Sequence, residues 1–210
     1  DTEAVTVLEF GDKPDEDARL NVSIELPTSS FSLCFQMYLM QHTKRFAPLH
    51  FVKRTILFSF ATEDFNLPSW ILLFGTSYSF VINEDILELY QWTGICLSVR
   101  DTSFDVFMNG RPIGHWIRND TIQRNTSLSL QKLKFAPSKK YKVASINMWD
   151  QELSIQELKE LTEPCNVTNH LTENIIFALD NIEEKAFDKI PSATWIENTS
   201  PEKLCSISPV

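Results

Sequence analysis

One stretch of the chain reads Phe31-Ser-Leu-Cys-Phe-Gln-Met-Tyr-Leu39, with an apolar residue at each of the positions 31, 33, 35, 37 and 39. Because successive side chains of a β-strand point to opposite faces, this period of two predicts a strand with one buried face. Further β-rich, apolar stretches bounded by turn residues occur at 55–61, 69–74, 78–82 and 94–99. Strands therefore dominate the predicted structure.

A hairpin is predicted at residues 104–113, where a strand, an Asn109-Gly110 pair and a return strand follow one another. Both Asn and Gly accept the positive φ angles of a type I′ turn, so this pair is a strong hairpin signal.

One helix is predicted. Ser154-Ile-Gln-Glu157 fits a capping box, in which the Ser154 hydroxyl accepts from a first-turn N–H and Glu157 reaches back. Ile155, Leu158 and Leu161 then fall on one face, and Pro164 ends the helix. Many strands and one helix predict an all-β fold: an antiparallel two-sheet jelly-roll sandwich with one short α-helix at about residues 154–163.

Composition excludes some classes of partner. The 210 residues carry a formal net charge of −9, which argues against nucleic acid and against anionic lipid, since both require dense Lys and Arg. The longest purely apolar run, residues 70–74, is too short to insert into a membrane.

Cysteines and glycosylation sequons indicate the compartment. The four cysteines are an even number and none lies in a C-x-x-C pair, which leaves three possible disulfide pairings. Asn-x-Ser/Thr sequons occur at Asn21, Asn119, Asn125, Asn166 and Asn198. Together these features predict an extracellular glycoprotein, either secreted or the ectodomain of a membrane protein.

Several segments resemble the pentraxins, within the wider laminin-G-like and concanavalin-like jelly rolls. The resemblance is most specific at Ile146-Asn-Met-Trp-Asp-Gln-Glu-Leu-Ser154, and it extends to residues 31–36, 56–62, 95–99 and 106–112. It covers about residues 5–195, which implies one domain at 1–195 and a C-terminal extension at 196–210. The resemblance also makes Trp149 a core position.

The resemblance implies a disulfide between Cys34 and Cys96, and the alternation of their two strands is compatible with it. This choice leaves Cys165 with Cys205, a bridge that would tie the extension back to the end of the helix. Each bridge is expected to add roughly 4 kcal/mol of stability, less any strain.

The resemblance further implies calcium, which pentraxins use to hold phosphorylated or carbohydrate ligands. Calcium needs six to eight oxygen ligands, mostly from carboxylates. The stretch corresponding to the family's acidic loop, residues 128–142, contains no Asp or Glu. In the other half of the site the nearest equivalents are Asp64 and Asn66. We therefore predict that the calcium site is lost and that no cofactor binds; any residual metal would be held by Asp64 and Asn66.

Five lysines occupy that same stretch: Lys132, Lys134, Lys139, Lys140 and Lys142. They form either an ordinary solvated face or a basic patch for a sulfated glycan or an acidic protein surface. Trp70 is either a core residue or, with Phe65 and Pro68, part of an exposed apolar rim.

No catalytic constellation is recognisable, and we predict that the chain is not an enzyme. The sequence has no G-x-S-x-G, H-E-x-x-H or phosphate-binding glycine loop. Its histidines, at 42, 50, 115 and 170, show no ligand spacing. No pair of carboxylates alternates along a strand as a glycosidase of this fold class would need.

The sequence thus predicts an extracellular recognition or adhesion module that binds a protein partner without calcium. Two alternatives remain: a secreted pattern-recognition lectin with a residual metal site, and a structural spacer domain of a larger receptor. The sequence gives no indication of self-assembly.

Overall fold

The computed structural model describes residues 5–10, 19–25, 30–40, 45–51, 56–61, 70–74, 78–82, 88–117, 125–131, 141–163, 173–181, 188–189 and 193–199. Side chains are described within residues 5–9, 30–40, 88–117, 141–163 and 173–181. Within these ranges no helix is long and apolar enough to cross a bilayer.

The first sheet has eight strands, and every neighbouring pair is antiparallel. Its main path runs β10 (Arg111–Ile117), β9 (Ser103–Met108), β8 (Trp92–Arg100), β3 (Ser30–Leu39), β12 (Tyr141–Trp149), β1 (Val5–Phe10) and β15 (Ala193–Thr199), with β13 (Ile175–Ala178) beside β12. A 3-10 turn, η1 (Leu179–Asn181), follows β13.

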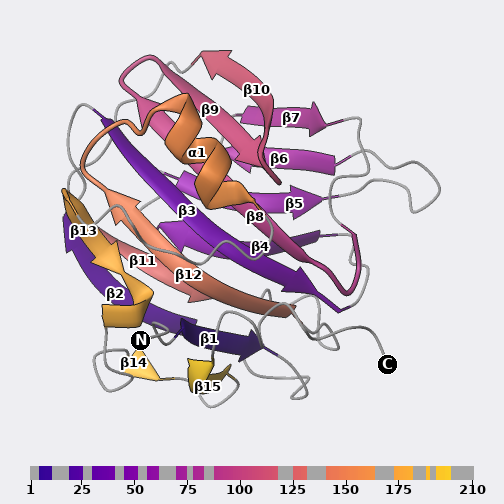
Figure 1. Cartoon of the computed structure of the whole chain (residues 1–210), viewed down its shortest axis with the longest axis vertical. Coiled ribbons are helices and arrows are strands. Elements are labelled where there is room, and N and C mark those ends of the chain that lie inside the picture. Colours follow the sequence, from indigo (N-terminus) through magenta and orange to yellow (C-terminus); the bar gives the residue numbers. More distant parts are fainter. Residues whose placement is uncertain are drawn as a thin grey trace.

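The second sheet has seven strands and is also antiparallel. Its order is β14 (Asp188–Lys189), β2 (Arg19–Glu25), β11 (Asn125–Gln131), β4 (Arg45–Phe51), β5 (Ile56–Ala61), β6 (Trp70–Phe74) and β7 (Tyr78–Ile82). Figure 1 shows β4–β7 behind the first sheet and α1 (Ile155–Thr162) in front of it. The predicted antiparallel jelly-roll sandwich with one short helix is confirmed.

Strand β15 crosses the expected domain boundary at residue 195. It pairs with β1 as far as Thr199, so the sheet includes the first residues of the expected extension at 196–210. The boundary itself stays a prediction.

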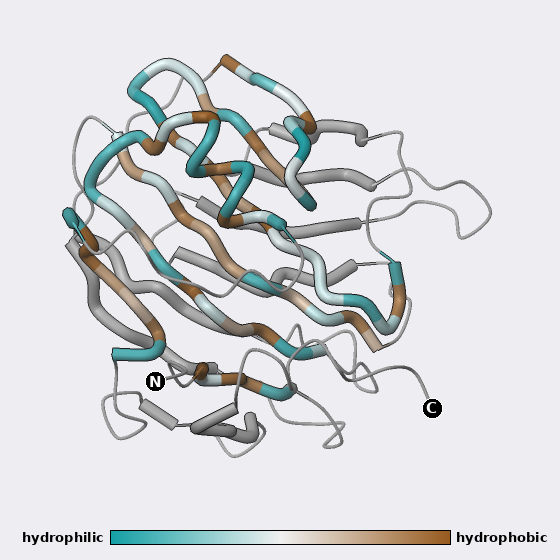
Figure 2. The backbone as a smooth tube through the Cα atoms, in the orientation of Figure 1, coloured by the Kyte–Doolittle hydropathy of each residue, from teal (hydrophilic) through white to brown (hydrophobic). Residues whose placement is uncertain are grey.

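Strand β3 is the centre of the first sheet and is buried on both faces. Its apolar row, residues 31, 33, 35, 37 and 39, is at most 2% exposed, but Ser32, Cys34, Gln36 and Tyr38 on the opposite face are buried as well. Figure 2 shows hydrophobic positions recurring along β3 and β12. The prediction of a strand with only one buried face is therefore wrong, because α1 and the cluster beneath it cover the outer face.

The outer face carries the Cys34–Cys96 disulfide implied by the family resemblance. The two cysteines are directly opposite each other in the β3–β8 pair. Around them lies an apolar group that we call the α1 cluster, which consists of Cys34, Cys96, Phe107, Trp149, Leu153 and Leu158. Trp149 is fully buried there, as expected of a core position.

Helix α1 begins with the predicted capping box. The Ser154 hydroxyl accepts from the Glu157 N–H at 3.3 Å, and the Glu157 carboxylate accepts from the Ser154 N–H at 2.6 Å. Leu158 is buried and Leu161 half-buried, but Ile155 is 65% exposed. The first turn, which carries Ile155, stands over an open space beside β10 rather than on the α1 cluster.

The last turn of α1 contacts β8 at backbone distance. A Cβ atom on Gly94 would lie 2.3 Å from the Thr162 carbonyl oxygen, so only glycine fits there. The adjacent Asn109-Gly110 turn has the predicted positive φ angles, 48° and 73°. It is bound on both sides: Asn109 Oδ1 accepts from the Gly94 N–H, and the Gly110 N–H donates to Thr162 Oγ1, each at 3.0 Å.

This close approach predicts that Gly94→Ala destabilises the fold. Overpacking against fixed backbone costs roughly 1–3 kcal/mol, and we expect the upper end of that range because the overlap is with a carbonyl. The matched variant Asn109→Gly keeps the positive φ and removes only one hydrogen bond, which costs about 1 kcal/mol. Urea unfolding of the disulfide-intact chain measures both losses. Equal stability of Gly94→Ala and the unsubstituted chain would contradict the described docking of α1.

Candidate functional site

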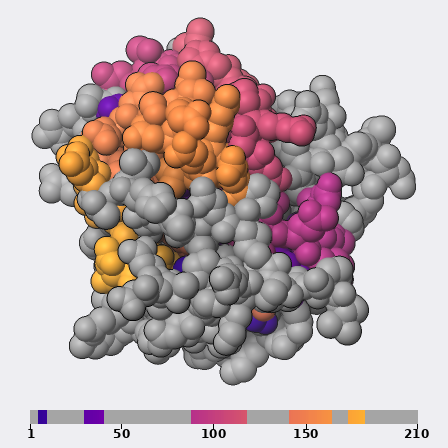
Figure 3. Space-filling view, in the orientation of Figure 1, coloured from indigo at the N-terminus to yellow at the C-terminus, as the bar shows by residue number. Residues whose placement is uncertain are grey.

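A pocket of about 520 Å³ lies between the first turn of α1 and the β9–β10 hairpin, a volume typical of ligand sites. Figure 3 shows α1 and the hairpin side by side on one face of the molecule. Its apolar lining consists of Phe107, Pro112, Ile113, Leu153, Ile155 and Leu158, and its polar lining consists of Arg100, Asp105, His115, Glu152 and Ser154.

Strand β10 reaches this position because of a bulge between Pro112 and Gly114. At Gly114 a Cβ atom would lie 2.5 Å from the Trp116 ring, so this position has no room for a side chain. Trp116 stacks on Phe104, with ring centroids 5.3 Å apart. The bulge shifts the register so that His115, not Gly114, is opposite Asp105, and His115 thereby enters the pocket.

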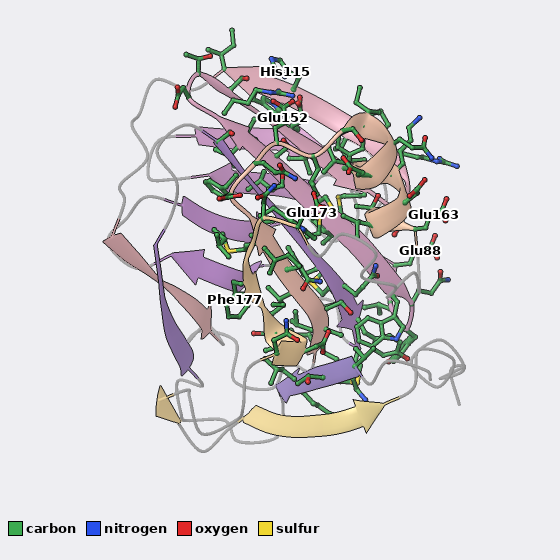
Figure 4. The ribbon with its side chains drawn as sticks, turned by 60° about the vertical axis from the view of Figure 1, so that its left-hand side comes forward. Glu88, His115, Glu152, Glu163, Glu173 and Phe177 are labelled. Carbon is green, nitrogen blue, oxygen red and sulfur yellow. A yellow bond between two sulfur atoms is a disulfide. The ribbon has the colours of Figure 1, made fainter. Side chains whose placement is uncertain are left out.

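Four charged or titratable groups from separate segments meet at one end of the pocket. Arg100 Nη1 donates to Asp105 Oδ2 at 2.6 Å, and Arg100 Nη2 donates to Glu152 Oε1. His115 Nδ1 lies 2.6 Å from Asp105 Oδ1. Figure 4 shows His115 and Glu152 near each other, well separated from Glu163. We call Arg100, Asp105, His115 and Glu152 the polar cluster.

The polar cluster is electrostatically coupled through Arg100. The hydrogen bond from Arg100 lowers the pKa of Glu152, although partial burial opposes this effect. Reciprocally, the hydrogen bonds to Glu152 and then to Asp105 raise the pKa of Arg100. Both groups therefore stay charged at neutral pH.

Both Asp105 oxygens have partners in the polar cluster. Arg100 contacts Oδ2 and His115 contacts Oδ1, and the Arg100 guanidinium joins Asp105 to Glu152. Within the described ranges, no group of three or more His, Cys, Asp or Glu side chains is arranged to hold a metal ion. What the pocket offers is an apolar wall with a charged end.

None of the candidate ligand-binding residues from the sequence is among the lining residues of the pocket. Several are outside the described residues, and predictions about them stay predictions: Asp64, Phe65, Asn66, Pro68, Asn119, Lys132, Lys134, Lys139, Lys140, Cys165, Asn166 and Cys205. Trp70 opens β6, but its side chain is outside the described set. Lys142 lies on β12, 17% exposed, with its ammonium 3.1 Å from Glu9 Oε2. Its charge is thus already partnered.

Three sequon asparagines, Asn21, Asn125 and Asn198, lie in strands. In the β2–β11 pair, Asn21 is opposite Ser129 and Asn125 is opposite Glu25. Asn21 and Asn125 therefore lie on strands of the second sheet, whereas the pocket lies on the first.

Sequence reasoning missed the polar cluster. His115 lacked ligand spacing, and Arg100, Asp105 and Glu152 were not singled out. Counting outward from the Asn109-Gly110 turn without a bulge would place Gly114 opposite Asp105. The one-residue shift that brings in His115 has no sequence signal beyond Gly114 itself.

Comparison with known proteins supports the fold only. No protein-family model and no curated protein matches the sequence. Among solved structures, a native heptameric SAP-like pentraxin from Limulus polyphemus is 16% identical with a TM-score of 0.66, over 98% of this chain and 99% of that one.

Two other solved structures match less of the chain. The botulinum neurotoxin serotype G binding domain matches at 11% identity and TM-score 0.55, over 74% of this chain and 42% of that one. Domain 4 of AbnA, an extracellular arabinanase from Geobacillus stearothermophilus, was solved in complex with arabinotriose. It matches at 17% identity and a TM-score of 0.52, over 65% of this chain and 68% of that one.

These likenesses and the strand order define the fold of the chain as a jelly-roll sandwich. Within that class its fold is pentraxin-like, with a diverged sequence.

The coupling of Glu152 to Arg100 predicts a pH-dependent share of stability. Because the folded pKa of Glu152 is lowered, its contribution is complete above the unfolded pKa and is lost as the pH falls through the folded value. Glu152 is 43% exposed, so the contribution is about 0.2–1 kcal/mol. Unfolding free energies of the unsubstituted chain and Glu152→Gln should differ by this amount at pH 7 and converge near pH 3. A constant difference across that range would disprove the coupling.

Proposed function

We propose that this chain is an extracellular recognition module that binds a protein partner, without calcium, in the pocket beside α1. The observation that carries the proposal is the pocket itself, in which an apolar wall and a charged end are joined on one face. Pockets of mixed lining, with a few placed polar groups, are the usual form of specific binding sites.

Rigidity of the walls supports the proposal. The segment before α1 is fixed by Ser32, whose hydroxyl donates to the Gln151 carbonyl at 3.0 Å and accepts from the Leu153 N–H at 3.1 Å. The end of α1 is fixed by Gln36, whose Nε2 donates to the Leu161 carbonyl at 3.3 Å. A preformed site loses little entropy on binding.

Calcium independence rests on the sequence. The stretch at 128–142 has five lysines and no carboxylate, and such a set would repel a divalent cation. The extracellular setting rests on the five sequons and on the Cys34–Cys96 bridge.

A lectin is the second candidate, favoured by the likeness to an arabinanase domain solved with arabinotriose. Against it, Phe107 is the one Phe, Tyr or Trp that lines the pocket, and its ring is buried. The exposed ring in the lining is the small His115 imidazole, which already contacts Asp105. A structural spacer domain, the third candidate, does not require a pocket of this kind, so the pocket favours a binding role over a spacer role.

The proposal predicts how exposed isoleucines contribute to binding. In a screen against receptor ectodomains, a genuine partner should bind equally in calcium and in chelator. Ile155→Gln should weaken binding about fivefold, because removing apolar contact area costs roughly 1 kcal/mol. Ile117→Gln is the matched control, since Ile117 is 71% exposed on β10 and does not line the pocket.

Two outcomes would count against this proposal. Equal loss with both isoleucine variants would remove the pocket from the interface. Binding to a glycan array that chelator abolishes would restore the calcium-dependent lectin.

A further inference from the structure

We infer that the pocket receives a basic side chain, lysine or arginine, presented by the protein partner. This inference rests on the proposed function and names the chemistry of the group that enters. Lys and Arg each combine an apolar stem with a cationic head, and the pocket has the same two-part layout.

The stem has an apolar surface to lie on. Ile155 of α1 and Pro112 of β10 are exposed and Ile113 is half-exposed, while Leu153 and Phe107 are buried beneath them. An alkyl chain laid between α1 and β10 would cover part of the exposed apolar area and gain from its removal from water.

The head has carboxylates to approach. Glu152 is 43% exposed and Asp105 is 19% exposed, so Glu152 is the more accessible of the two carboxylates. Asp101, which follows Arg100, and Asp150, two residues before Glu152, are also exposed. Cations gain from such a concentration of negative charge.

An anionic group fits this end less well. Arg100 is shared between Asp105 and Glu152, so an incoming carboxylate would have to displace one of them and meet the repulsion of the other. A cation does not have to displace either carboxylate from Arg100, because it can hydrogen-bond to the carboxylates while the existing pairs stay intact.

The test uses phage-displayed random 12-residue peptides, selected on the glycosylated, disulfide-intact chain. The inference predicts enrichment of peptides with a Lys or Arg beside aliphatic residues. By fluorescence polarisation, such a peptide should bind Glu152→Gln about three- to fivefold more weakly, the range of a half-exposed ion pair. Replacing its basic residue by Gln should cost the unsubstituted chain the same factor and cost Glu152→Gln little.

Glu163→Gln is the matched control, an exposed glutamate at the other end of α1 with the same charge change. Its affinity should equal that of the unsubstituted chain. Equal weakening by both glutamate variants would overturn the inference, because it would reflect net charge alone.

The outcomes also separate this inference from the proposed function. Enriched peptides without basic residues that lose affinity on Ile155→Gln would overturn the inference and keep the pocket as the binding site. If Ile155→Gln does not change the affinity of the enriched peptides, both the inference and the proposal that this pocket is the binding site are overturned. Enrichment no higher than on an unrelated glycoprotein would overturn the inference, leaving the ectodomain screen to decide the function.

Discussion

The last turn of α1 and strand β8 approach each other so closely at Gly94 that no side chain fits between them. This approach holds the C-terminal end of the helix against the sheet, where Gln36 and the Gly110 N–H bind its last residues. The N-terminal end is held differently, by Ser32 and the segment at 151–153. Between these two anchors the first turn stands clear of β10, which leaves Ile155 exposed and the pocket open.

Docking of α1 also explains why much of the outer face of β3 is buried. Beneath the helix, the Cys34–Cys96 bridge joins the two central strands and packs with Trp149 and Leu158. Burial of these side chains removes apolar surface from water at about 25 cal/mol per Å², so the helix and the outer face stabilise each other. The pocket is therefore built on the most buried part of the described chain rather than on a surface loop.

Local signals made much of this fold predictable. The period-two alternation of residues 31–39, the Asn109-Gly110 turn and the Ser154–Glu157 capping box depend on neighbours in sequence, and the structure contains all three. The polar cluster was not predictable, because it joins Arg100, Asp105, His115 and Glu152 through strand register and helix docking. The bulge before Gly114 changes that register by one residue. The exposure of Ile155 was not predictable for a related reason: helical periodicity gives the relative directions of side chains, but not the extent of the surface against which the helix packs.

A retained scaffold does not fix a retained function. Where the pentraxin resemblance implies calcium, the sequence has lysines at 132–142. Beside α1 and β10, the structure has a preformed pocket. Hydrogen–deuterium exchange of the chain, alone and bound to its partner, tests most directly which region is used. The account predicts new protection in β10 and at residues 151–158, with little change at 62–69 and 132–140. Protection confined to 62–69 and 132–140 would contradict it and return the binding site to the family's calcium face.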